Sequence, residues 1–181
     1  MTDELATILE NHLVIEDPSL RDSLLEILNS CQRPKSLRGA IVCLDALCVR
    51  YSSSIGFLDK VPYCCLFLSY PYFKGKHFPQ AIRCANLAID GFDQRNHVWN
   101  RSVARWICAL IYKGCKYFDE AEQCFDAAAK LMVQDIQDHK RRSRYEKAEK
   151  CEAIYSLLLQ DARDLRGNSR PQKLLTKVGE G

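Results

Sequence analysis

The chain has 181 residues, 47% of them hydrophobic, and a formal net charge of +3. This length fits one domain with or without a tail, and the apolar content is that of a globular protein with a core. This net charge is too small to indicate a polyanionic partner by itself.

The first residues lack the features of a targeting segment. Residues 1–4 are acidic, and charges interrupt the apolar residues that follow. A secretory signal has a basic start and an unbroken apolar run. The longest apolar stretches, such as residues 64–68, are too short to span a bilayer. We therefore expect a soluble cytoplasmic protein without a membrane partner.

Helical periodicity dominates the first part of the chain. Residues 3–14 place apolar side chains and one histidine at spacings of three and four, which predicts an amphipathic helix: Leu5, Ile8, Leu9, His12 and Leu13. Asp17 is expected to cap a second helix with Pro18 in its first turn. Pro34 interrupts the chain, and Ser36 is expected to cap a third helix before a polar loop at residues 52–56.

The middle of the chain predicts three more helices. The first covers residues 59–74, is rich in aromatic residues, and is expected to bend or open locally at Pro71. The second begins at Pro79 and is expected to end near residue 89, with Gly91 as its C-cap residue. The third is capped by Asn96 and ends at Gly114.

No proline or glycine occurs between Phe118 and Arg166. A single solvated helix of that length is implausible in so small a chain, so we expect a break between about residues 135 and 143, where polar residues crowd together. The last helix then packs against the body through Ala148, Cys151, Tyr155, Leu158 and Leu159. Residues 166–181 are expected to form a flexible tail.

Two segments of the chain resemble each other. Tyr72, Phe78, Ala81, Ala85 and Ala88 correspond to Tyr112, Phe118, Ala121, Phe125 and Ala128, which lie 40 residues later. A small residue allows two helices to approach closely, and the larger residue that follows fills the space between them. Hairpins of this kind bury their apolar faces only by stacking on one another.

This pattern resembles the tetratricopeptide repeat (TPR), whose period is about 34 residues. The match is best at Trp106-x-x-Ala109-x-x-Tyr112, together with the positions that begin at Phe118. The resemblance implies an all-α domain over residues 1–165, a right-handed stack of about three helical hairpins. The hairpins would cover residues 17–51, 59–90 and 96–134, and residues 143–165 would form a capping helix.

The resemblance also implies a function in protein binding, as an adaptor, chaperone or regulatory subunit and not as an enzyme. In this family the first helix of each hairpin lines a concave groove that binds a peptide or helix of a partner. The equivalent positions here are Tyr63, Leu66, Tyr70, Phe73, Val103, Trp106, Leu110 and Lys113. Aromatic residues are frequent anchors of interfaces. Alternatively, some of these side chains pack inside the protein. If the groove is open, Trp106→Ala weakens partner binding without unfolding the protein.

Two other interpretations stay open. A basic segment, with Lys140, Arg141, Arg142 and Arg144, is expected to contact phosphates if the protein binds nucleic acid or ribonucleoprotein. No nucleic-acid-binding motif accompanies it, and a solvated helix junction explains it equally well. A third interpretation is a structural module that oligomerises through exposed hairpin faces.

The sequence carries little sign of catalysis or metal binding. It contains ten cysteines without a C-x-x-C pair, so we expect reduced thiols packed as small apolar groups. The four histidines are scattered, and no phosphate loop or catalytic motif occurs. We therefore expect no catalytic residues, no metal ligands and no cofactor.

Overall fold

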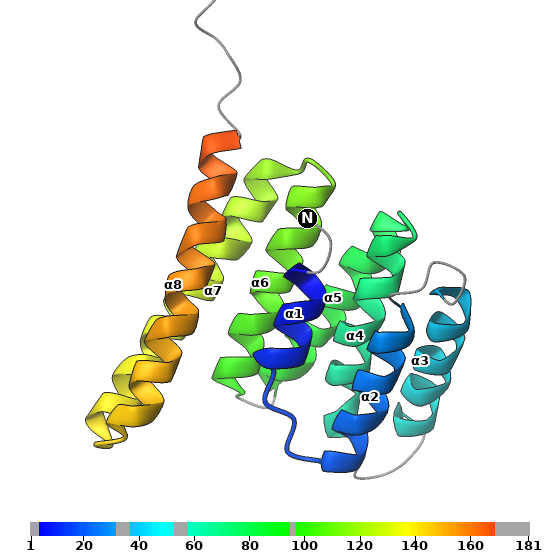
Figure 1. Ribbon diagram of the computed structural model, residues 1–181, viewed down its shortest axis with the longest axis horizontal. Helices are drawn as coiled ribbons and strands as arrows, with labels where there is room; N and C mark the ends of the chain where they lie inside the picture. Colours follow the sequence, from blue (N-terminus) through cyan, green and yellow to red (C-terminus); the bar gives the residue numbers. More distant parts are fainter. Residues whose placement is uncertain (1–3, 32–36, 53–57, 95–96, 169–181) are drawn as a thin grey trace, which may run out of the picture.

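The computed structural model describes residues 4–31, 37–52, 58–94 and 97–168, and every regular element in them is helical (Figure 1). The prediction of an all-α protein is therefore confirmed for these residues. The elements are α1 (Glu4–Asn11), α2 (Pro18–Cys31), α3 (Leu37–Ser52), η2 (Leu58–Lys60), α4 (Val61–Lys74), α5 (Phe78–Gln94), α6 (Val98–Gly114), α7 (Phe118–Arg141) and α8 (Tyr145–Asn168).

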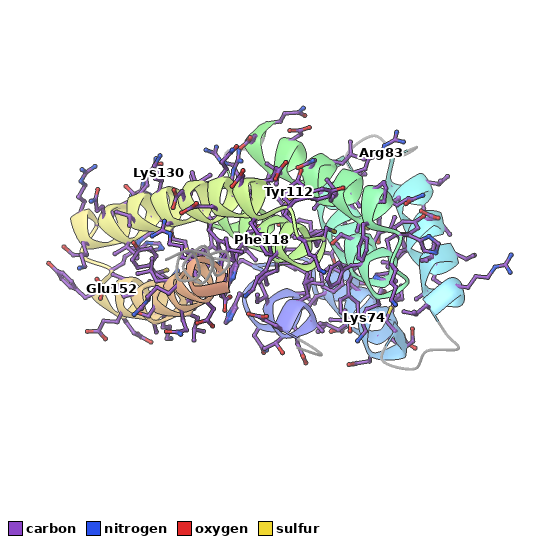
Figure 2. All side chains as sticks on the ribbon, turned by 90° about the horizontal axis from the view of Figure 1, so that it is seen from above. Lys74, Arg83, Tyr112, Phe118, Lys130 and Glu152 are labelled. Atoms are coloured by element: carbon purple, nitrogen blue, oxygen red, sulfur yellow. The ribbon has the colours of Figure 1, made fainter. Side chains whose placement is uncertain are left out.

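From α2 to α8, each α-helix packs against the next one in the chain (Figure 1). Helix α1 packs across the row, against α4 and α6. Seen from above, Lys74 lies on the side of the molecule where α1 and α2 lie, whereas Arg83 and Lys130 lie on the opposite side (Figure 2). The core is largely continuous and extends from α1 to α8.

Two turns 40 residues apart have the same backbone geometry. The amide of His77 donates to the carbonyl of Tyr72, and the amide of Tyr117 donates to the carbonyl of Tyr112. The residue before each donor, Lys76 or Lys116, has a positive φ of 61° or 66°. This left-handed conformation ends each helix and reverses the chain within a few residues.

The start of α2 agrees with its predicted cap. The carboxylate of Asp17 accepts a hydrogen bond from the backbone amide of Leu20 at 3.1 Å and forms an ion pair with Lys60. The predicted break at Pro34 and the predicted caps at Ser36 and Asn96 lie outside the described residues.

The predicted end of α5 was wrong. Gly91 lies inside α5, which continues to Gln94. A Cβ atom at position 91 would come within 2.4 Å of Cγ of Pro62 on α4. The glycine is therefore explained by the close approach of two helices and not by a C-cap. At Pro71, where the sequence predicted a bend or a local opening, α4 continues as a helix to Lys74.

The predicted break after residue 135 is confirmed. Helix α7 ends at Arg141, and α8 begins at Tyr145. Between them, Ser143 has a positive φ of 56° and the amide of Arg144 donates to the carbonyl of His139. The predicted start of the tail at residue 166 was wrong, because α8 continues to Asn168. The rest of the predicted tail, residues 169–181, lies outside the described residues. Within the described ranges, none of the helices combines the length and the apolar character that a membrane span requires.

Candidate functional site

The residues predicted to line a partner groove come together, but α1 covers them. Six are buried: Tyr63, Leu66, Tyr70, Val103, Trp106 and Leu110. Phe73 and Lys113 are partly exposed. All eight predicted residues lie on α4 and α6, the two helices against which α1 packs (Figure 1). The side chains therefore do not line an open groove, because the first helix of the same chain occupies the face.

Helix α1 rests on this face through an apolar stripe. Leu5, Ala6, Ile8 and Leu9 are buried, whereas Thr7 and Glu10 are exposed. The sequence predicted this stripe from its spacing of three and four. It did not show which helices the stripe contacts, because amphipathic periodicity identifies a buried face but not its partner.

A hydrogen-bonded clamp holds the segment that follows α1. The side-chain amide of Asn100 donates to the carbonyl of Val14 at 2.8 Å, and its oxygen accepts from the amide of Val14 at 3.0 Å. The hydroxyl of Tyr63 donates to the same carbonyl at 3.1 Å. Nε1 of Trp99 donates to the carbonyl of His12 at 2.8 Å. Sequence reasoning missed Asn100 and Trp99, since nothing in the local pattern distinguishes them from ordinary helix residues.

Trp106, on α6, connects α8 with the residue that follows α1. Its ring stacks on the imidazole of His12, with centroids 5.6 Å apart, and its Nε1 donates to Oδ2 of Asp161 at 2.7 Å. Burial, reinforced by the nearby carboxyl group of Glu4, raises the pKa of Asp161 to about 7. The Asp161 carboxyl group is therefore poised to change its charge near neutral pH, against the first residue of α1.

The raised pKa of Asp161 predicts a pH-dependent stability. The unfolded value is 3.8, so the folded protein binds the proton more tightly and its free energy of unfolding falls as pH rises from about 4 to 7. Titration of this one group changes the free energy of unfolding by at most about 1.4 kcal/mol per pH unit. Urea denaturation of wild type and Asp161→Asn between pH 5 and 8 measures it. Wild type should lose stability relative to the variant as pH rises, and parallel curves would contradict the prediction.

One end of the covered face stays accessible. A cavity of about 50 Å³ lies between the start of α1 and the ends of α4 and α6. Its lining includes Phe73, Lys74 and Lys113, with Glu4 on the side of α1. The two lysines lie at this end beside Glu4, and the carboxyl group of Asp161 also faces Glu4.

The four cations of the predicted phosphate-binding segment are all exposed, around the turn between α7 and α8. Nζ of Lys140 lies 2.5 Å from Oε1 of Glu152, and Arg142 pairs with Asp138 at 3.1 Å. Arg141 and Arg144 have no ion pair with the residues that the structure describes. Half of the predicted cations are thus neutralised by carboxylates, which favours a solvated helix junction.

A second cavity, of about 600 Å³, lies between the segment after α1, the start of α6 and the α7–α8 turn. Its lining includes Asp135, His139 and Cys151, whose ligand atoms all lie within 4.8 Å of one another. Burial, together with the charge of Asp135, raises the pKa of Cys151 to about 11. A thiol that stays protonated is a poor nucleophile, so the cluster does not resemble a cysteine–histidine catalytic pair.

Sequence reasoning did not recognise this cluster, because Asp135 and His139 are four residues apart on one helix while Cys151 comes from the next. The α7–α8 turn brings them together, and no motif with fixed spacing describes such a set. In the comparisons with known proteins, the chain matches no family model, no curated protein and no solved structure.

Proposed function

We propose that the chain is a TPR-like helical scaffold that binds an amphipathic helix of a partner protein on the face formed by α4 and α6. The observation that carries this proposal is the docking of α1, which shows the chemistry that the face accepts: a short helix with buried Leu5, Ile8 and Leu9. The equivalent turns before α5 and α7 support the repeat architecture. An adaptor, chaperone or regulatory subunit would use such a face.

The surroundings of α1 define the partner. It is a helix with leucine or isoleucine at spacings of three and four, because Leu5, Ile8 and Leu9 follow that pattern. An acidic residue at its N-terminus would lie near Lys74 and Lys113, where Glu4 lies now. In this proposal α1 occupies the site within the chain, and a partner helix binds by taking its place.

Release of α1 provides the test. In Leu5→Asp/Leu9→Asp, two carboxylates replace buried leucines, and burying unpaired charges is costly, so α1 should leave the face. A fluorescent peptide with the sequence of residues 1–16 is then titrated and followed by anisotropy. The variant should bind the peptide at least about tenfold more tightly than wild type, because the tethered α1 competes at a high effective concentration.

Two controls sharpen this test. A Thr7→Asp/Glu10→Gln variant changes exposed positions of α1 and should bind the peptide as weakly as wild type. A peptide that carries the two aspartates should not bind to any variant. If the Leu5→Asp/Leu9→Asp protein keeps its helical circular dichroism but does not bind the wild-type peptide, the proposal is wrong. Unfolding of that variant also contradicts it, because α1 is then an inseparable part of the core.

A further inference from the structure

We propose that Asp135, His139 and Cys151 form a binding site for a divalent transition-metal ion of the zinc type. The three side chains are spaced as ligands of one ion. Nε2 of His139 lies 3.4 Å from Oδ2 of Asp135, and the thiol of Cys151 donates a hydrogen bond to the same oxygen at an Sγ–Oδ2 distance of 3.8 Å. Ligand atoms about 2.0 to 2.3 Å from a tetrahedral Zn²⁺ are about 3.3 to 3.8 Å apart. The Nε2–Oδ2 distance is longer than a charge-assisted hydrogen bond of about 2.7 to 2.9 Å. All three ligand atoms lie within 4.8 Å of one another.

His139 is largely withdrawn from solvent. Its side chain is 19% exposed, and its Nδ1 is buried without a hydrogen-bond partner among the described residues. Nε2 is the nitrogen that faces Asp135, so an ion between these two groups leaves Nδ1–H to donate to a buried water, the usual arrangement of a metal-bound histidine. The Asp135 side chain is also 19% exposed, and Cys151 is buried. The three groups are thus withdrawn from solvent, as metal ligands usually are.

The ligand set matches the charge and the preference of Zn²⁺. A carboxylate, a neutral imidazole and a thiolate carry two negative charges, which balance the ion when the thiol proton is released to solvent. Oxygen, nitrogen and sulfur ligands together favour Zn²⁺ over Mg²⁺ or Ca²⁺, which take oxygen ligands. All three residues line the cavity of about 600 Å³, through which a water molecule or another ligand can reach a fourth coordination position.

Nearby basic residues do not oppose a cation at this site. Arg142 pairs with Asp138 at 3.1 Å, and Lys150 pairs with Glu146 at 2.8 Å. Lys147, which also lines the cavity, is exposed, so water and salt screen its charge. The fixed charges around the cluster are therefore largely neutralised, and the two ligand anions determine the local potential.

Metal titration of the full-length protein tests this site. The reduced, chelator-treated protein is titrated with Co²⁺, which gives a thiolate-to-metal charge-transfer absorption, and Zn²⁺ should then displace the Co²⁺. Wild type should bind one ion per chain with this absorption. Cys151→Ser should lose the absorption, and Asp135→Asn and His139→Gln should each weaken Zn²⁺ binding at least about tenfold.

Cys43→Ser is the matched control, because Cys43 is an exposed thiol on α3, outside the cluster. It should retain the absorption and the Zn²⁺ affinity. The proposal is overturned if wild type binds no Co²⁺, or if Cys151→Ser keeps a thiolate absorption of equal strength, which would assign the ion to other cysteines. The thermal midpoint with and without Zn²⁺ separates loss of the site from loss of the fold: wild type should gain stability, and folded Asp135→Asn should not.

Discussion

Replacing Trp106 with alanine is expected to lower the free energy of unfolding by about 3 to 5 kcal/mol, the usual cost of truncating a large buried aromatic side chain. Trp106 is only 2% exposed, and it contacts elements on both of its sides through His12 and Asp161. The substitution therefore leaves a cavity between α6, α8 and the residues that follow α1. Thermal denaturation should show a midpoint lowered by about 10 °C or more.

This outcome is the opposite of the expectation from the resemblance, under which Trp106→Ala weakens a partner without unfolding the protein. Tyr145→Ala serves as the control, because Tyr145 is 63% exposed and its truncation should cost about 0.5 kcal/mol or less. Trp106→Phe retains most of the apolar volume and removes the hydrogen bond to Asp161. If Trp106→Ala melts within about 2 °C of wild type, α1 does not cover this face in solution and the groove is open.

Gly91→Ala is expected to destabilise the protein by about 1 to 3 kcal/mol, although alanine is the better helix former. The added Cβ would lie 2.4 Å from Cγ and 3.1 Å from Cβ of Pro62. A pyrrolidine ring near the start of α4 has little freedom to rotate away, so α4 and α5 must separate. Chemical denaturation of wild type and variant measures the change in the free energy of unfolding.

Gly39→Ala is the matched control for this substitution. Gly39 is also a helical glycine, on α3, but a Cβ atom built there has no neighbour within 4 Å. The same chemical change should therefore stabilise the protein by about 0.5 to 1 kcal/mol through helix propensity alone. Equal effects at both positions would show that α4 and α5 do not pack as closely as the structure places them.

Local chemistry predicted most of the helices. The cap at Asp17, the amphipathic stripe of α1 and the break between α7 and α8 all follow from side chains within one or two turns of each other. Such features depend on hydrogen bonds and periodicity along a single segment, which a sequence displays directly. Gly91 misled the prediction because a glycine near a helix end and a glycine at a helix contact look alike until the opposing residue is known.

The sequence by itself determined that the chain is helical and that a break separates α7 from α8, and its resemblance to a repeat family placed the apolar side chains of α4 and α6 on one face. Only the tertiary structure decided that α1 covers this face, that Trp106 is core, and that Cys151 meets Asp135 and His139. The reason is physical. Apolar burial is non-directional, so a sequence shows that a face must be covered without showing which segment covers it. A ligand set assembled across a turn depends on helix packing, which residue spacing does not reveal.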